Sequence, residues 1–146
     1  MRKVKLKIFL IFASWFLWIN FTSAATLYWE KSQEEYVLGD IFLVRLKIDT
    51  QGERINAAQI GISFPKENLE VIDLFKENSI FSLWPKEPQV LKDEGKIFLV
   101  GGVPRGFAGQ GNVVTVAFKV ISASSKLEKV KVEFSGDCLV LLNDGL

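Results

Sequence analysis

Strict alternation of apolar and other residues over short segments is the feature that most constrains how this chain folds. The alternation recurs in four segments, residues 42–48, 57–64, 112–121 and 130–134. A period of two residues predicts β-strands with one buried face. The side chains expected to point inward include Phe42, Val44, Leu46, Ile48, Ala58, Ile60, Ile62, Phe64, Val114, Val116, Phe118 and Val120.

Turn signals separate these segments, and no long segment has the period of a helix. Apolar runs at residues 69–75, 96–100 and 138–142 are expected to be strands too, and residues 78–83 at most a single helical turn. The glycine-rich residues 101–111 are expected to form a sharply turning loop, pinned by Phe107. Many short strands joined by turns predict an all-β sandwich.

The residue types that are missing exclude several kinds of enzyme. The chain has 146 residues, no histidine and one cysteine, Cys138. Mechanisms and metal sites that need histidine are excluded, and so is an internal disulfide. A glycosidase needs two carboxylates across a cleft, for which a sandwich of about 120 residues leaves little room. We therefore expect no enzymatic activity, and we expect Cys138 to be a small buried hydrophobe.

Residues 1–25 have the order of a secretory signal peptide, and residues 26–146 are expected to form one domain. Four basic residues precede the apolar residues 8–21, and the small residues 22–25 follow. The alternative is an uncleaved membrane anchor, although a membrane span needs about 20 apolar residues. Without the four N-terminal cations, 14 basic and 17 acidic residues remain, so the net charge is −3. That balance gives no indication of nucleic-acid binding.

Several blocks of sequence resemble a cohesin domain, the module through which cellulosome scaffoldins hold dockerin-bearing enzymes. The blocks are VLGDIF at residues 37–42, INAAQIGISFPKENLEVI at residues 55–72, and residues 95–120, 130–135 and 140–145. The resemblance covers residues 26–146. It implies a jelly-roll β-sandwich, a fold shared with carbohydrate-binding modules of the cellulose-binding type, and no catalytic activity.

The end of the sequence departs from the cohesin pattern. Cohesins usually continue past an asparagine-aspartate-glycine turn into a final strand that pairs with the first strand. Here Asn143, Asp144 and Gly145 are followed by Leu146 alone. The resemblance therefore predicts that the closing strand is missing. Either the sequence is a fragment of a longer protein, or the edge beside residues 27–30 is open. Any C-terminal anchor would lie beyond Leu146.

The resemblance also implies a partner-binding face. In cohesins of the best-known type, the outward side of the strand at residues 57–63 takes part in docking a dockerin helix. The asparagine and aspartate typical of that face fall at Ala57 and Gln59, so this chain departs from the pattern. The alternation also points Phe98 and Val100 outward, and outward apolar side chains favour a flat protein-binding patch. The predicted patch is Ala57, Gln59, Gly61, Phe98 and Val100. The alternative is that a neighbouring loop or another part of a longer protein covers these residues.

Two further features concern ligands. Trp84 precedes Pro85 in a loop and is a candidate for carbohydrate contact; the alternative is that Phe81 and Trp84 cap one end of the sandwich. No cofactor is expected, and the absence of a D-x-D-x-D-G loop means that the chain is not itself a dockerin. A structural calcium ion would need oxygens such as those of Asp137, Asn143 and Asp144, which turn chemistry explains equally well.

Three functions are consistent with the sequence. The first is a non-catalytic module, secreted or at the cell surface, that binds a protein partner such as a dockerin-like module. The second is a carbohydrate-binding module that acts in polysaccharide breakdown. The third is a structural domain of a larger surface protein. Contact with a membrane is expected only through an uncleaved signal anchor or a C-terminal anchor.

Overall fold

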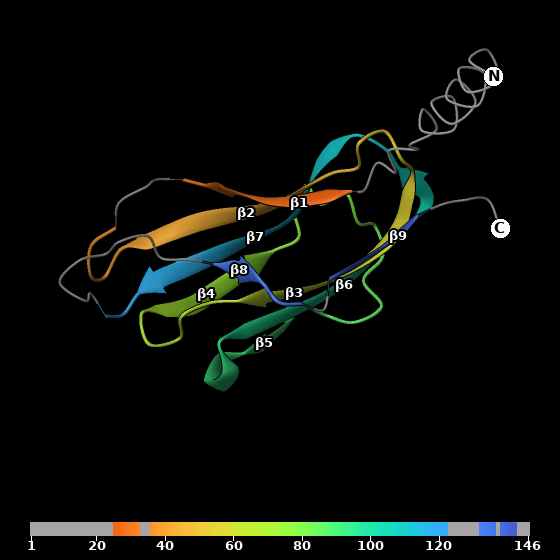
Figure 1. Ribbon diagram of the computed structural model, residues 1–146. Coiled ribbons are helices and arrows are strands. Elements are labelled where there is room, and N and C mark those ends of the chain that lie inside the picture. The colour runs from red at the N-terminus through yellow and green to blue at the C-terminus, as the bar shows by residue number, and fades with distance from the viewer. Residues whose placement is uncertain (1–24, 33–35, 123–131, 137, 143–146) are drawn as a thin grey trace, which may run out of the picture.

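The computed structural model describes residues 25–32, 36–122, 132–136 and 138–142. These residues form two antiparallel β-sheets packed face to face, as the layers of Figure 1 show. Their one helical element is the short 3-10 helix η1 (Lys92–Glu94). The strands are β1 (Thr26–Lys31), β2 (Ile41–Asp49), β3 (Ile55–Ser63), β4 (Leu69–Phe75), β5 (Gln89–Leu91), β6 (Lys96–Phe107), β7 (Gln110–Val120), β8 (Glu133–Phe134) and β9 (Leu139–Leu142). The prediction of an all-β sandwich is confirmed.

Each sheet combines strands that are distant in sequence. Sheet A has the order β1-β2-β7-β4. Sheet B has the order β5-β6-β3, and both β8 and β9 pair with the remaining edge of β3. Within the described part of the chain, β1 pairs with β2 alone, so the far edge of β1 has no described strand beside it.

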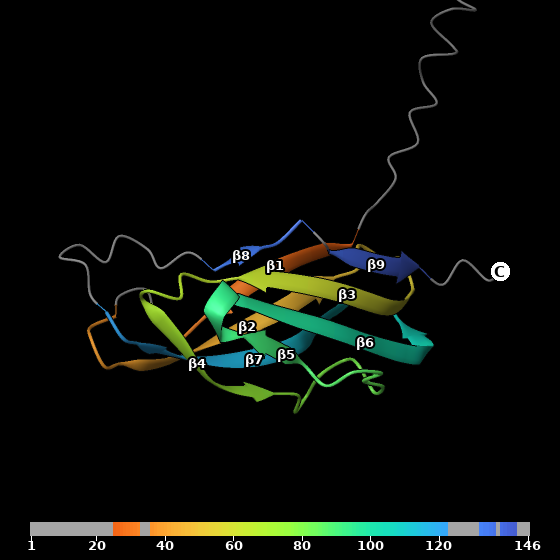
Figure 2. The ribbon, with the colours of Figure 1, turned by 90° about the horizontal axis from the view of Figure 1, so that it is seen from below.

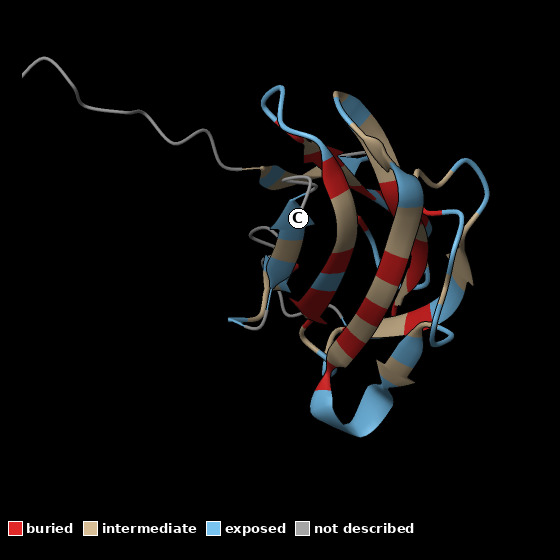
Figure 3. Ribbon diagram, turned by 90° about the vertical axis from the view of Figure 1, so that its right-hand side faces the viewer, coloured by how far each residue is buried: buried red, intermediate tan, exposed pale blue. Residues whose placement is uncertain are grey.

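The core lies between the two sheets and is made by the alternate residues that the sequence analysis selected. Figure 3 shows buried bands that alternate with less buried ones along the strands. Phe118 is fully buried, and its ring centroid lies 5.8 Å from that of Phe42 and 5.5 Å from that of Phe64. Tyr36 closes one end of this group by stacking on Phe42 at 3.8 Å. The inward alternation of β2, β3 and β7 is therefore correct.

The prediction of a loop at residues 101–111 is wrong. Strand β6 continues to Phe107 and β7 begins at Gln110, so Ala108 and Gly109 alone connect them. Gly109 takes a positive φ of 119°, and its N–H donates to Thr50 Oγ1 over 2.9 Å. Phe107 is partly buried against the core. The sequence signal was misread because a glycine in a strand often marks a close approach of another group rather than a turn.

The predicted helical turn at residues 78–83 is also absent. This segment instead forms isolated β-bridges, from Ser79 to Asn112 of β7 and from Leu83 to Gly102 of β6. It thus passes from one sheet to the other, and its Phe81 side chain is buried in the core.

The prediction that Cys138 is buried is wrong as well, because Cys138 is exposed. Strand β8 pairs as far as Ile62 of β3, and β9 begins opposite Gln59. The chain between β8 and β9 is therefore longer than the two residues of β3 that it spans. The alternation is lost in this irregular connection. The Cys138 thiol contacts the carbonyl oxygens of Gly61 and Ser135 at 3.5 and 3.4 Å.

Two adjacent glycines of β6 differ in the space around them. A Cβ atom added to Gly101 would overlap the ring of Phe81, which is only 3% exposed. A Cβ atom added to Gly102 would have ordinary contacts of 3.5 Å with Asn56 O and 3.8 Å with Leu83 Cβ. Position 101 therefore requires glycine, because the buried Phe81 ring occupies the space of a Cβ atom. Position 102 has room for one.

We predict that Gly101→Ala destabilises the domain by about 1–3 kcal/mol, because the buried Phe81 ring must leave its place. Gly102→Ala is the matched control, and it should change the free energy of unfolding by less than about 0.5 kcal/mol. Urea unfolding curves of both variants measure this difference. Equal effects of the two substitutions would contradict the packing of Phe81 on β6.

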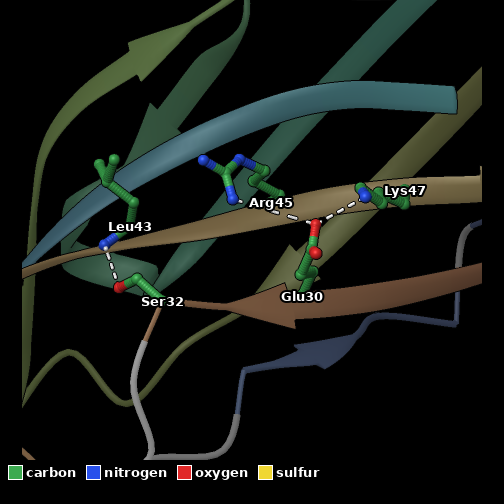
Figure 4. Close-up of polar contacts among 5 residues, drawn as sticks. All are labelled: Glu30, Ser32, Leu43, Arg45 and Lys47. Atoms are coloured by element: carbon green, nitrogen blue, oxygen red, sulfur yellow. Dashed lines mark hydrogen bonds and ion pairs between the residues drawn. The ribbon is translucent and has the colours of Figure 1, made fainter.

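Ion pairs on the outer face of sheet A join β1 to β2. The Glu30 carboxylate lies 2.6 Å from Lys47 Nζ and 4.0 Å from Arg45 Nη1 (Figure 4). Next along the strands, the N–H of Leu43 donates to Ser32 Oγ over 3.2 Å. The hydrogen bond from Lys47 lowers the pKa of Glu30 below its ordinary value of 4.5. The shift is a surface effect, because the group is exposed.

We predict that Glu30→Gln slightly lowers the stability of the domain at neutral pH, and that this difference disappears in acid. The pKa of Glu30 is lower in the folded state than in the unfolded state. Its contribution is therefore present above the ordinary value of 4.5 and is lost as the pH falls through the folded-state pKa. Thermal melts of the two proteins between neutral pH and pH 3 test this. A difference that stays constant over that range would show that the charge of Glu30 does not contribute.

Candidate functional site

The outer face of sheet B brings the predicted patch residues together. Ala57 lies opposite Gly102, Gln59 opposite Val100, and Gly61 opposite Phe98. The residues that alternate with them, Ala58, Ile60, Ile97 and Leu99, are buried in the core. In an antiparallel pair, directly opposite residues share a face. The side chains of Gln59, Phe98 and Val100 therefore lie side by side on the outer face of sheet B. Sheet B is the sheet nearer the viewer in Figure 2.

Three leucines that the sequence analysis did not select extend this surface. On β9, Leu139 lies opposite Gln59 and Leu141 opposite Ala57, and they are 55% and 50% exposed. On the other side, Leu83 is bridged to Gly102 and is 54% exposed. Residues 138–142 were recognised as an apolar strand, but their pairing partner was unknown. No signal in the sequence placed Leu83 beside β6.

We call the resulting surface the apolar face. Leu91 of β5 completes it: it lies opposite Lys96, one row beyond Phe98, and is partly exposed. Gln59 is the one strongly polar side chain among the rows that contain Ala57, Gln59 and their opposite residues. The members of the apolar face are Ala57, Leu83, Leu91, Phe98, Val100, Leu139 and Leu141.

Gly61 lies on the same side of β3 but is not itself exposed. A Cβ atom there would overlap Ser135 Oγ and would lie 3.6 Å from the Phe98 ring. Ser135 donates its backbone N–H to the Gly61 carbonyl over 2.9 Å, which fixes it above the glycine. Gly61 therefore makes room for Ser135 and Phe98, and these two residues form the surface at this point.

Charged groups lie at the border of the apolar face. Lys96, in the same row as Leu91, has its ammonium 3.1 Å from the carboxylate of Glu94. Glu133 of β8 lies at the same end, opposite Ser63. The rows of Ala57 and Gln59 are therefore neutral and apolar, with the Gln59 amide as their hydrogen-bonding group, and a second amide, Gln89 of β5, lies opposite Phe98. Such a surface suits another protein rather than an ion or a charged small molecule.

Trp84 lies apart from the rows of the apolar face and packs against the core. Its ring meets Phe81 edge-on, with centroids 5.6 Å apart. The ammonium of Lys76 lies 5.6 Å from the centroid of the Trp84 ring and 2.6 Å from the Glu87 carboxylate. A cation over the ring competes with a sugar for the same aromatic surface. This packing agrees with the alternative hypothesis, in which Phe81 and Trp84 cap one end of the sandwich.

The described residues provide few features of other kinds of site. No group of three or more histidine, cysteine, aspartate or glutamate residues among them is arranged to hold a metal ion. Asp137, Asn143 and Asp144, the residues considered for calcium, lie outside the described residues. None of the described segments forms a helix that is long and apolar enough to cross a membrane.

Comparisons with known proteins identify the fold. No family model matches the sequence, and no curated protein matches it. Solved structures do match. The cohesin module of a family 33 glycoside hydrolase from Clostridium perfringens has a TM-score of 0.65 at 14% identity, over 86% of this chain and 88% of that one. A non-cellulosomal cohesin from Archaeoglobus fulgidus has a TM-score of 0.59 at 18% identity, over 80% and 77%.

A third structure contains a bound partner. The sixth cohesin of scaffoldin B from Acetivibrio cellulolyticus, solved in complex with a Cel5 dockerin mutant, has a TM-score of 0.63 at 16% identity. The match covers 80% of this chain and 85% of that one. This chain therefore has the cohesin fold, a β-sandwich of the jelly-roll type.

Proposed function

We propose that this chain is an exported, non-catalytic cohesin-type module that holds a dockerin-like protein partner on the outer face of sheet B. The observation that carries the proposal is the apolar face, on which seven small or large apolar side chains from five segments surround Gln59. The complex of the Acetivibrio cellulolyticus cohesin with a dockerin supports the choice of partner.

The energetics of such a contact favour an apolar partner surface. Leucines 83, 139 and 141 are each about half exposed, so a partner that covers them removes apolar area from water. Each square ångström of that area contributes about 25 cal/mol. The amide of Gln59 then needs a hydrogen-bonding group from the partner, because an unpaired buried polar group costs about 1–3 kcal/mol. Ala57 and Gln59 also leave the face without the carboxylate typical of the best-known cohesins.

We predict that a charge in the middle of the apolar face weakens partner binding by at least about tenfold. The test variants are Val100→Lys, Ala57→Asp and Leu139→Asp. Each would desolvate a charge without a counter-ion on binding, and none of the three residues belongs to the buried core. Thr26→Lys, at the exposed first residue of β1 in sheet A, is the matched control and should bind as the unchanged protein does. Titration calorimetry against a dockerin-like module measures the affinities.

Trp84→Ala separates this proposal from carbohydrate binding. It should leave protein binding intact, because Trp84 lies outside the apolar face. The same variants are therefore titrated against soluble and insoluble polysaccharides. If Trp84→Ala alone abolishes binding, and only a polysaccharide binds, the protein-binding proposal is wrong and the carbohydrate-binding function replaces it.

Export is the second part of the proposal, and the order of residues 1–25 supports it. We predict that mass spectrometry of the exported protein finds its N-terminus at Ala25 or Thr26. Ala25 already packs against the core, so a chain that begins there keeps all of β1. An exported protein that still begins at Met1 would mean that the segment acts as an anchor.

A further inference from the structure

The exposed large apolar side chains of the described residues fall into two groups on opposite sheets. One group, Leu83, Leu91, Leu139, Leu141 and Leu142, lies on or beside the apolar face of sheet B. The other group gathers at one end of sheet A, where β2 begins and β7 ends. Its members are Val37, Leu38, Ile41, Leu43, Ile72 and Ile121. The proposed partner site does not account for this second group.

Register places Ile41 and Leu43 of the second group on the outer face of sheet A. Ile41 lies opposite Lys119 and Leu43 opposite Ala117, so their side chains share a face. Ile72 lies in a bulge of β4 at the position where this strand passes Ala117. Ile41 is 60% exposed and Ile72 is 47% exposed. We call Ile41, Leu43 and Ile72, with the buried Ala117 beside them, the sheet A patch.

The neighbouring turn is held firmly at the same end of the sheet. The N–H of Gly39 donates to the Val120 carbonyl over 2.9 Å, and the N–H of Val37 donates to the Asp40 carboxylate over 2.9 Å. Tyr36 anchors the turn to the core through its stack on Phe42. Val37 and Leu38 therefore stay exposed because the backbone fixes them there.

The charges in and around the sheet A patch are self-complementary. Lys119 lies opposite Ile41 on β2 and opposite Glu70 on β4, and its ammonium forms no ion pair with the described residues. The Asp73 carboxylate, opposite Ala117, accepts a hydrogen bond from the Leu74 N–H alone in the same part of the chain. The third charged residue, Glu70, is engaged by Lys92 at 3.4 Å. Lys119 on β7 and Asp73 on the neighbouring strand β4 thus carry opposite charges without an ion-pair partner among the described residues, and they lie beside Ile41 and Ile72.

We propose that the sheet A patch binds a second copy of this chain across a two-fold axis. A two-fold interface needs a surface that is complementary to itself, and a neighbouring cation and anion meet that need. Lys119 of each copy faces Asp73 of the other, and the apolar side chains of the two sheets interdigitate as in a face-to-face sheet packing. The dimer has its two apolar faces on opposite outer sides, so it presents two partner sites that point apart.

Sedimentation equilibrium over a concentration series tests the dimer. The sample is the full chain in the form that the host cell produces. Ile41→Glu should raise the dissociation constant of the dimer by at least about tenfold, because it removes an apolar side chain from the interface and places a carboxylate opposite Lys119 in the same copy, where it competes with Asp73 of the other copy. Leu139→Asp is the matched control on the opposite sheet. It should leave the dimer unchanged even though it weakens partner binding, so the dimer and the proposed function can fail separately.

A charge exchange tests the pairing of Lys119 with Asp73. Lys119→Asp and Asp73→Lys should each weaken the dimer, and the double variant should restore it to within about threefold of the unchanged protein. Circular dichroism melts establish that each variant is folded. A protein that remains monomeric up to about 0.1 mM would overturn the proposal. A double variant no better than the single ones would overturn it as well.

Discussion

The burial of alternate side chains between two sheets is the constraint on which the rest of this structure depends. Phe118 of sheet A lies 5.8 Å from Phe42 of the same sheet and 5.5 Å from Phe64, which directly follows β3 of sheet B. Once these residues point inward, the period of a strand turns their neighbours outward. Both outer faces are therefore consequences of the core. The apolar face of sheet B is the outward half of the strands whose inward half supplies Ile60, Ile62 and Leu99.

The apolar face is assembled from strands that are distant in the sequence, and no single strand provides it. Val100, Gln59 and Leu139 form one continuous row, although they come from strands separated by tens of residues. Leu83 joins the next row through a single bridge to Gly102. A flat sheet can present such rows without a pocket, and that suits contact with a protein. The apolar face of sheet B and the sheet A patch lie on opposite sides of the module. In the proposed arrangement, one module therefore binds a partner and a second copy of this chain at the same time.

Local rules failed where a neighbour in space decided the conformation. Gly101 and Gly102 were interpreted as parts of a loop, but β6 runs through them and Gly101 accommodates the buried Phe81. Cys138 was expected in the core because of its apolar neighbours, yet the irregular connection between β8 and β9 exposes it. Gly61 was predicted on the correct side of β3, but Ser135 covers it. For Gly101 and Gly61 the deciding contact comes from a residue at least 20 positions away.

The sequence by itself determined the class of fold, the inward and outward faces of the long strands, and the side of β3 and β6 on which Ala57, Gln59, Phe98 and Val100 lie. These properties follow from the two-residue period, which is local. The tertiary structure alone decided which strands are neighbours, and hence that Leu83, Leu139 and Leu141 complete the apolar face. Strand pairing joins residues that are far apart along the chain, and many pairings satisfy the same alternation. Only the packing of the whole core selects one of them.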